Sequence, residues 1–208
     1  MEKFFITGVD TDIGKTYVSA YLCLKYKKEG KTVGYFKPFQ SGAIKKEDEL
    51  IAPDVYELQK KGIESKYSYL LEGEVSPYLA SIKAGVNFDI KKVKKDIEEF
   101  SLNKDAVIIE GAGGLLCPIK EKYTFLDFIK EINSKDDIKT IIVTTPDLGR
   151  INHTLMTIQC AKNENMEIEG IIINKMPKNP TESQKSFMDE LKAFCDTKII
   201  DVIFKENV

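Results

Sequence analysis

Gly8-Val9-Asp10-Thr11-Asp12-Ile13-Gly14-Lys15-Thr16 decides the fold, because the apolar run 4–6 precedes this stretch and a helical pattern follows it. A strand, a glycine-containing loop, the sequence Gly-Lys-Thr and a helix make a phosphate loop, which binds nucleoside triphosphates. In such a loop the backbone N–H groups point at phosphate oxygens, Lys15 reaches the β- and γ-phosphates, and the Thr16 hydroxyl ligates Mg²⁺. Five residues separate Gly8 from Gly14, one more than usual, and Val9 stands at the expected glycine position. The alternative is a chance strand-to-helix turn, which the flanking strand and helix disfavour.

The composition indicates one α/β domain spanning residues 1–208. The chain has 208 residues with 42% hydrophobic content, which is enough for a sizeable core. Its 31 basic and 33 acidic residues are intermixed and leave a net charge of −2, so the sequence shows no electrostatic footprint for nucleic acid. Arg150 is the only arginine, so phosphate binding must rely on lysines and backbone N–H groups.

Cysteine spacing and hydropathy bear on the cellular setting. The four cysteines, Cys23, Cys117, Cys160 and Cys195, show no Cys-x-x-Cys spacing, which argues against a zinc site and a disulfide framework. No run approaches the ~20 apolar residues that span a bilayer, and the N-terminus lacks a basic region followed by a long apolar segment. We therefore expect a soluble cytoplasmic protein without a membrane partner.

Short apolar runs alternate with longer segments of helical spacing. The runs predict strands at 3–7, 32–37, 105–110, 138–144, 168–174 and 198–203. The segments between them predict helices at 15–29, 53–61, 77–84, 89–100, 124–133, 151–164 and 182–195. This order predicts an α/β fold with a three-layer, doubly wound, mainly parallel sheet, in which ligands bind beyond the carboxyl ends of the strands. The least regular region, 40–88, is the candidate for substrate-binding loops.

The segment 37–42, Lys-Pro-Phe-Gln-Ser-Gly, follows the second predicted strand. A lysine at a strand end beside a proline-fixed turn can project into the nucleotide cleft. Phosphoryl transfer builds negative charge on the transferred group, so Lys37 would lower the barrier as a second cation besides Lys15. Ser41 adds a hydroxyl to the same turn. The alternative is a surface lysine beside a turn, and this segment alone does not separate the two hypotheses.

Two carboxylates are candidate Mg²⁺ ligands. Glu110 ends the third predicted strand and is followed by Gly-Ala-Gly-Gly at 111–114, and these glycines let the backbone approach a ligand closely. Packing alone explains this combination poorly. Asp54 follows Pro53 at a helix start, so its alternative role is to favour the helix dipole rather than to supply an oxygen to Mg²⁺.

Polar residues also follow the fourth and fifth predicted strands. Asn152 or Thr154 can cap the helix that begins near residue 151, although a helix N-terminus beside Asn152 is also a ready site for a carboxylate. His153 is the only histidine, and we favour a structural role because the sequence shows no partner for it. Asn174 has both a donor and an acceptor on its amide, which suits the edge of a purine.

Together these segments resemble the dethiobiotin synthetase family, ATP-dependent carboxylases that close the ureido ring on the biotin pathway. The resemblance runs from Gly8 to about Lys175. Its strongest elements are Thr-Gly-x-Asp-Thr-x-x-Gly-Lys-Thr at 7–16, Lys-Pro-x-x-Ser-Gly at 37–42 and Glu-Gly-Ala-Gly-Gly at 110–114. Supporting matches are Asp54, Ser76-Pro77-x-x-Ala80-Ser81, and Gly-x-x-Asn-His-Thr-Leu at 149–155. The long phosphate loop is also the family's own form.

The resemblance implies a P-loop nucleoside triphosphate hydrolase fold and the family's cyclo-ligase reaction, in which an amine of 7,8-diaminononanoate captures CO₂ as a carbamate. ATP phosphorylates the carbamate, and the second amine closes the ring. The resemblance also implies a homodimer, in which the distal carboxylate of the substrate meets the partner subunit around the helix start at Asn152.

The same resemblance assigns site residues. It implies that Lys37 and Lys15 are catalytic and that Thr16, Asp54 and Glu110 surround Mg²⁺. It implies substrate contacts from Thr11, Ser41, Gly111, Gly113 and Asn152. It implies ATP contacts from Asp12, Ile13, Gly14, Lys15, Thr16, Tyr17, Asp54, Glu110, Gly111, Ala112, Gly113, Asn174 and Lys175.

The sequence departs from the family pattern near its end. Family members usually carry a proline-containing segment after the last strand that touches the adenine, but residues 199–208 contain no proline. The preference for ATP over other triphosphates is therefore open.

Two rival functions share the nucleotide-binding elements. A nucleotide-dependent switch ATPase resembles this chain but carries a second lysine early in the phosphate loop, where Asp10 stands here. A cobyrinate-type amide synthetase, another P-loop ligase, usually adds a glutaminase domain, for which 208 residues leave no room.

Overall fold

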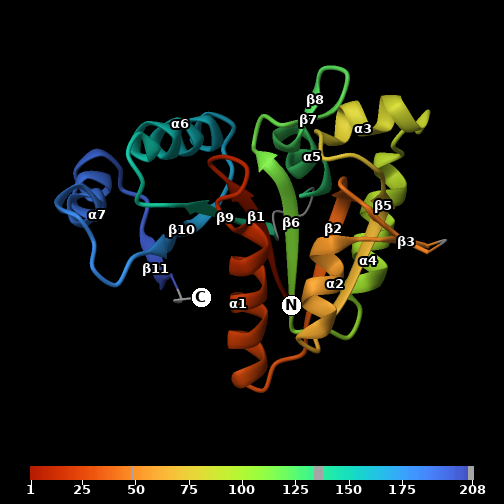
Figure 1. Cartoon of the computed structure of the whole chain (residues 1–208), viewed down its shortest axis with the longest axis horizontal. Helices are drawn as coiled ribbons and strands as arrows, with labels where there is room; N and C mark the ends of the chain where they lie inside the picture. The colour runs from red at the N-terminus through yellow and green to blue at the C-terminus, as the bar shows by residue number, and fades with distance from the viewer. Residues whose placement is uncertain (48, 134–137, 206–208) are drawn as a thin grey trace.

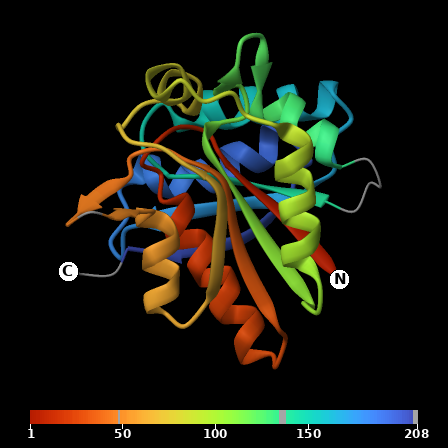
Figure 2. The same ribbon diagram turned by 90° about the vertical axis from the view of Figure 1, so that its right-hand side faces the viewer.

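A central β-sheet with helices on both faces organises the chain (Figures 1 and 2). The computed structural model describes residues 1–47, 49–133 and 138–205. The elements are β1 (Glu2–Gly8), α1 (Lys15–Lys28), β2 (Val33–Gln40), β3 (Ile44–Lys46), β4 (Glu49–Ile51), α2 (Pro53–Lys60), β5 (Glu64–Leu70), α3 (Pro77–Ala84), α4 (Ile90–Ser101), β6 (Ala106–Gly114), β7 (Pro118–Lys120), β8 (Tyr123–Thr124), α5 (Phe125–Ile132), β9 (Ile138–Thr144), α6 (Arg150–Asn163), β10 (Ile168–Met176), α7 (Glu182–Phe194) and β11 (Ile199–Phe204).

The sheet has seven strands in the order β11-β10-β9-β1-β6-β2-β5, and the neighbouring strands pair in parallel. The helices that connect parallel strands must cross over one face or the other, which makes the sheet doubly wound. The predicted α/β class with a parallel sheet is confirmed. Each predicted strand and helix is present in the part of the chain that the structure describes, with shifts at the ends.

The alternation of side chains along each strand builds two cores. On one face, which lies toward the viewer in Figure 1, α1 and α2 pack over Phe4, Ile6 and Ile108. On the opposite face α4 and α5 pack over Phe5 and Ile109, while α6 and α7 pack over the strands at the β11 edge. Both faces are covered, so the inner strands are apolar along most of their length.

Some elements differ from the prediction. The strand β5 lies within the region 40–88 that was predicted to be irregular, and it was missed because this edge strand is polar and partly exposed. The small antiparallel ladders β3–β4 and β7–β8 were also missed. The strand β6 does not end at Glu110 but continues through the glycines to Gly114, where it pairs with Gly8 of β1.

No helix in the described ranges is both long and apolar enough to cross a membrane.

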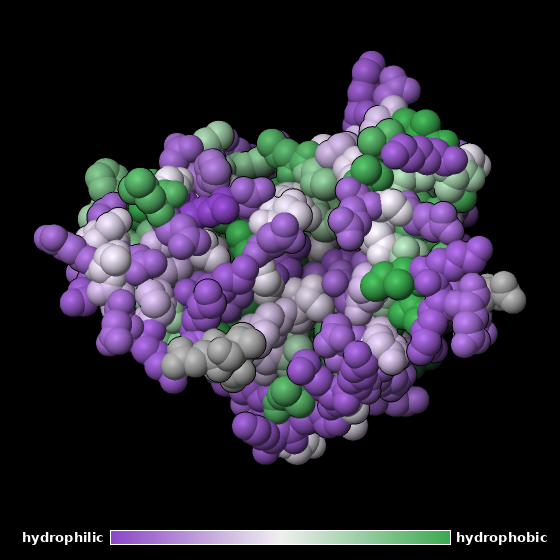
Figure 3. All heavy atoms as spheres, viewed as in Figure 1, coloured by the Kyte–Doolittle hydropathy of each residue, from purple (hydrophilic) through white to green (hydrophobic). Residues whose placement is uncertain are grey.

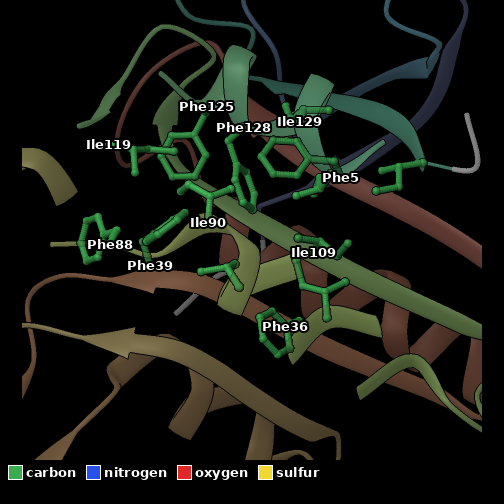
Figure 4. Packing of buried hydrophobic residues seen from close by; sticks show 14 of the residues in the cluster. Phe5, Phe36, Phe39, Phe88, Ile90, Ile109, Ile119, Phe125, Phe128 and Ile129 are labelled. Carbon is green, nitrogen blue, oxygen red and sulfur yellow. The ribbon is translucent and has the colours of Figure 1, made fainter. Parts of the chain in front are cut away.

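An aromatic cluster under the carboxyl end of β2 supports the segment that carries Lys37 (Figure 4). Phe39 is 2% exposed, and its ring centroid lies 4.8 Å from that of Phe88 and 5.3 Å from that of Phe128. Because β2 carries Phe39 between Lys37 and Ser41, this packing holds the strand end in place.

We expect Phe39→Ala to lower the free energy of unfolding by about 3–5 kcal/mol, since it removes a large buried side chain and leaves a cavity. Phe194→Ala is the matched control, because the side chain of Phe194 is 73% exposed, and it should change the free energy by less than about 0.5 kcal/mol. Urea denaturation measures both values. Equal losses in the two variants would contradict this account of the cluster.

Candidate functional site

A cavity of about 880 Å³ opens at the carboxyl edge of the sheet. This volume is in the range of small-molecule sites. Its lining residues come from the loop after β1, the end of β2, the start of α2, the segment before α3 and the end of β6. They include Thr11, Asp12, Gly14, Lys15, Thr16, Lys37, Gln40, Ser41, Asp54, Glu110, Ala112, Gly113, Cys117 and Lys175. Most of the predicted site residues therefore meet in one place.

The phosphate loop ends at Gly14, which has φ 87° and precedes the first residue of α1, Lys15. A side chain on Gly14 would collide with the Asn174 amide, because a Cβ there would lie 2.3 Å from the Asn174 nitrogen. Lys15 is 7% exposed and its Nζ donates to the backbone oxygen of Asp10 at 3.1 Å. Burial lowers the pKa of Lys15. The lysine thus lies folded over its own loop, beside the cavity.

Lys37 makes three contacts within the protein. Its Nζ lies 2.7 Å from Glu110 Oε1 and 2.8 Å from Asp54 Oδ2, and it donates to the Gly111 oxygen at 3.1 Å. Burial lowers the pKa of Lys37, but the two carboxylates outweigh burial and raise that pKa to about 12. An ammonium group has three hydrogens, so all of its donors are engaged. The hypothesis of a surface lysine is wrong, because Lys37 is 4% exposed.

Glu110 is the acceptor on which several donors converge. Its Oε1 also accepts from the Thr16 hydroxyl at 2.9 Å, and its Oε2 accepts from the Ser19 hydroxyl at 2.7 Å. Glu110 is 1% exposed and Ser19 is fully buried. Sequence reasoning missed Ser19, although its place one turn after Lys15 puts it on the same side of α1 and was a usable signal.

Asp54 occupies the first turn of α2, where Pro53 begins the helix. Burial raises the pKa of Asp54, but Lys37 outweighs burial and holds that pKa below its ordinary value. Asp54 both begins the helix and contacts Lys37. It can therefore interact favourably with the helix dipole and also belong to the site.

The donor set fits Mg²⁺. Thr16, Asp54 and Glu110 direct one hydroxyl and two carboxylates to the same place, and hard oxygen donors are what Mg²⁺ prefers. In the described part of the chain no group of three or more His, Cys, Asp or Glu side chains could hold a metal, so phosphates and water would have to complete the coordination.

The glycines of β6 face the cavity edge. Gly113 has φ 62°, which other residues rarely adopt, and a Cβ there would lie 3.2 Å from the Cys117 sulfur. Gly111 directs its carbonyl oxygen to Lys37, and a Cβ there would lie 2.8 Å from the Phe5 ring. Ala112 lines the cavity between the two glycines.

Asn174 lies beneath the phosphate loop rather than on the cavity wall. It is 3% exposed, and its side-chain nitrogen donates to the Ile13 oxygen at 2.8 Å. The Ile13 side chain is part of the core. The bond to Ile13 uses one of the two hydrogens on that nitrogen, so the predicted contact of Asn174 with adenine depends on its oxygen and on the remaining hydrogen. Lys175 lines the cavity and donates to the Asp12 oxygen.

Four other predicted residues lie outside the cavity lining: Ile13, Tyr17, Gly111 and Asn152. Tyr17 is 44% exposed on α1. Asn152 is exposed on α6, where its amide nitrogen lies 3.5 Å from the Met156 sulfur. Residues 206–208, part of the segment compared with the family's adenine-binding region, lie outside the described residues.

The start of α6 is tied to the phosphate loop. Arg150 forms an ion pair with Asp10 at 2.6 Å, and its guanidinium also lies 3.3 Å from His153 Nδ1. The predicted capping by Asn152 or Thr154 is wrong, because Gly149 occupies the N-cap position. Thr154 instead donates to the Arg150 oxygen one turn earlier.

Gln40 and Cys117 also line the cavity and were not predicted as site residues. The Gln40 amide nitrogen donates to the Ser41 oxygen at 2.8 Å, and Gln40 also hydrogen-bonds to Asp54. Gln40 stood inside the segment 37–42, so its position was a signal. The sequence offered no signal that Cys117 would line the cavity.

Comparisons with known proteins identify relatives of this chain. Residues 2–203 match the family described as AAA domain. The chain is 39% identical over 188 residues to the ATP-dependent dethiobiotin synthetase BioD of Clostridium perfringens (strain 13 / Type A), covering 86% of this chain and 81% of that protein. It is 34% identical over 208 residues to the protein of the same name from Halalkalibacterium halodurans, covering 98% of this chain and 84% of that protein.

Among solved structures, a ParA family ATPase from Chlorobium tepidum TLS has a TM-score of 0.62 and 13% sequence identity, covering 99% of this chain and 85% of that chain. At this identity the likeness shows the fold alone, and it confirms the predicted P-loop nucleoside triphosphate hydrolase fold. The identity to the named relatives is much higher and extends over most of both chains. The chain therefore belongs to the AAA domain family and, with these relatives, to the family of ATP-dependent dethiobiotin synthetases.

Proposed function

We propose that this protein is an ATP- and Mg²⁺-dependent cyclo-ligase that forms the ureido ring of dethiobiotin from 7,8-diaminononanoate and CO₂. Family membership supports the overall reaction. The observation that carries the proposal within the molecule is the Lys37 ammonium, buried between Asp54 and Glu110 beside the phosphate loop.

The first step builds a carbamate. One amine of the substrate adds to CO₂, which forms an N–C bond and releases a proton to water. Ser41 lines the cavity on the same strand end as Lys37, so its hydroxyl is placed to hydrogen-bond to the reacting amine or to the carbamate. Thr11 and Gly113 also line the cavity and are proposed substrate contacts.

The second step transfers the γ-phosphoryl group. A carbamate oxygen attacks the γ-phosphorus, and the bond from that phosphorus to the bridging oxygen of ADP breaks. Lys15 and Lys37 supply positive charge where negative charge develops, which is electrostatic catalysis without a covalent enzyme intermediate. Thr16, Asp54 and Glu110 would hold Mg²⁺, which when bound neutralises charge on the phosphate oxygens.

The third step closes the ring. The second amine attacks the carbamoyl carbon, the C–O bond to the phosphate breaks, and phosphate leaves as the amine gives up its proton. Water would hydrolyse this mixed anhydride, so the proposed reaction needs the second amine to be held next to the carbamoyl carbon. Asn174 and Lys175 are proposed to lie near the nucleotide.

We further propose that the protein acts as a homodimer in the cytoplasm. The exposed apolar residues near the cavity support a subunit interface: Leu148, just before α6, is 94% exposed, and Ile82 of α3 is 56% exposed. Figure 3 shows hydrophobic residues in green along the upper surface, over α3 and between α3 and α6. Such surfaces are common at protein–protein contacts. A partner seated there would bring Asn152, which lies outside its own cavity, toward the other subunit.

The decisive experiment is a coupled assay of ADP release in the presence of bicarbonate, with and without the diamino acid. We expect ADP release to require the diamine and to match the amount of dethiobiotin formed. Diamine-independent hydrolysis would instead favour a switch ATPase.

We predict that Lys37→Ala lowers kcat by about 10²–10³ while leaving nucleotide affinity largely intact, because its charge acts on the transferring group. The substitution also leaves two buried carboxylates without their cation, so thermal unfolding must show that the variant is folded at the assay temperature. Lys37→Gln, which keeps a donor, provides a second test, and Lys60→Ala on the exposed face of α2 is the control. Unchanged turnover in both Lys37 variants would refute the catalytic role.

We predict that Glu110→Gln raises the Mg²⁺ concentration needed for half-maximal activity by at least about 10-fold, since a neutral amide is a poorer ligand for a hard cation. A Mg²⁺ titration of ADP release at fixed ATP measures this requirement. The control is Glu99→Gln on α4, whose carboxylate is largely exposed. A titration curve that coincides with that of the wild-type protein would count against Glu110 as a metal ligand.

We predict that Leu148→Asp shifts the protein from dimer to monomer and raises the KM for the diamine, because a charge at the interface disfavours association. Size-exclusion chromatography with light scattering gives the oligomeric state. Leu102→Asp is the control, because Leu102 is also exposed, at 66%, but lies at the end of α4. A wild-type protein that is monomeric at micromolar concentration would remove the basis of this proposal.

A further inference from the structure

Lys37 cannot act on a ligand without giving up a protein partner. Its three donors are engaged by Glu110, Asp54 and the Gly111 oxygen. In the proposed function Lys37 turns toward the carbamate and the transferring phosphoryl group, and the present inference rests on that function. At least one of these contacts must break when the lysine binds an anion.

Glu110 is the partner for which this loss matters most. It is 1% exposed, so water cannot replace a donor that leaves. A buried carboxylate that loses a hydrogen bond is costly unless another donor takes over. Its Oε1 accepts from Lys37 and Thr16, and its Oε2 accepts from Ser19. A carboxylate has about four acceptor positions, so one is unused by these three donors.

Tyr35 brings an unused donor to the same place. It lies on β2 two residues before Lys37, so both side chains point to the same face of the sheet. It pairs with Ile108 of β6, two residues before Glu110. The side chain of Tyr35 is fully buried. Its hydroxyl lies close enough to the Glu110 carboxylate for a weak contact to raise the pKa of the phenol, but it makes no hydrogen bond of normal geometry to any of the described residues.

The electrostatics agree with this placement. Burial raises the pKa of the Tyr35 phenol, and the carboxylates of Glu110 and Asp54 raise it further. The phenol therefore keeps its proton at neutral pH and remains a donor. A tyrosine hydroxyl buried without a partner is unusual, since buried polar groups are nearly always hydrogen-bonded. Packing alone does not require the oxygen, because phenylalanine has nearly the same shape.

We propose that Tyr35 is a positioning residue whose hydroxyl donates to Glu110 when Lys37 leaves that carboxylate to bind an anionic ligand. In the ligand-free protein Lys37 and Thr16 hold Oε1, and the phenol lies beside the carboxylate without a well-formed hydrogen bond. When Lys37 turns away, Glu110 keeps its bond from Ser19 and gains one from Tyr35. The bond from Tyr35 replaces the one that Lys37 gave up, beside the Mg²⁺ that Glu110 would hold in the proposed function, and it lowers the free energy of the state in which Lys37 is free to act.

The test is Tyr35→Phe, which removes only the hydroxyl. In the ligand-free protein we expect the thermal midpoint to equal or exceed that of wild type, because no bond is lost and a buried unpaired group is removed. Toward ligands we expect Tyr35→Phe to perform worse than the wild-type protein. The dissociation constant for Mg²⁺ with a non-hydrolysable ATP analogue should rise, or kcat should fall, by about 10-fold to 100-fold, the range of a hydrogen bond to a charged group.

Thr140→Val is the matched control. Thr140 on β9 is also fully buried, and its hydroxyl also lacks a hydrogen-bond partner among the described residues. It has no place in the site, so its removal should leave the midpoint equal or higher without changing nucleotide affinity or kcat. A general effect of deleting a buried hydroxyl would appear in both variants.

Two outcomes would overturn the proposal. A lower thermal midpoint in ligand-free Tyr35→Phe would mean that the hydroxyl already bonds in the free protein. Unchanged analogue binding together with unchanged kcat would mean that it is idle. If the wild-type protein formed no dethiobiotin, the proposed function would fail, whereas analogue binding by the two variants would still decide whether Tyr35 supports Glu110.

Discussion

The structure depends on one buried ionic arrangement, the Lys37 ammonium between the carboxylates of Asp54 and Glu110. Each of these charges comes from a different element, β2, α2 or β6, so the three elements must keep their relative positions. A shift of any one would leave a buried charge unpaired, at a cost of several kcal/mol. Buried ion pairs contribute little more to stability than apolar residues of similar volume, so stability alone does not explain the arrangement. The chemistry proposed at the carboxyl edge of the sheet does explain this arrangement.

The same arrangement explains how cations can face a cavity without a bound anion. Lys37 has its two carboxylates, and Lys15 has the backbone oxygen of Asp10. Lys37 therefore has all three of its donors engaged before any phosphate arrives, whereas Lys15 has one oxygen partner. Binding of an anion exchanges one oxygen partner for another, and it does not require a bare charge to be stored in a low-dielectric site. The carboxylates that lose a cation need other donors or a metal ion, which is why the residues around Glu110 matter as much as the lysine.

Much of the fold could be predicted from the sequence, because the inner strands are buried on both faces and appear as apolar runs. The edge strand β5 could not, since its exposed residues remove that pattern. In the site, Lys37 and Glu110 were predicted from their positions at the ends of predicted strands, although the structure places both inside longer strands, β2 and β6. Ser19 and Tyr35 were not, because one is a small polar residue inside a helix and the other a tyrosine inside a strand. The helical spacing from Lys15 was a signal for Ser19, but the position of Tyr35 follows from how β2 packs against β6, which no local pattern encodes.

The likeness to a ParA family ATPase at 13% identity shows how little the fold alone says about chemistry. The two chains share the fold, so a difference in chemistry must come from the side chains that the fold carries. At the position where switch ATPases carry a lysine, this chain has Asp10, and that carboxylate is paired with Arg150 at the start of α6. The pairing adds no positive charge next to the triphosphate and joins the loop to the helix that begins beside it. In the proposed function this loop would hold the nucleotide beside the small substrate, and the positive charge near the γ-phosphate would come from Lys15 and Lys37.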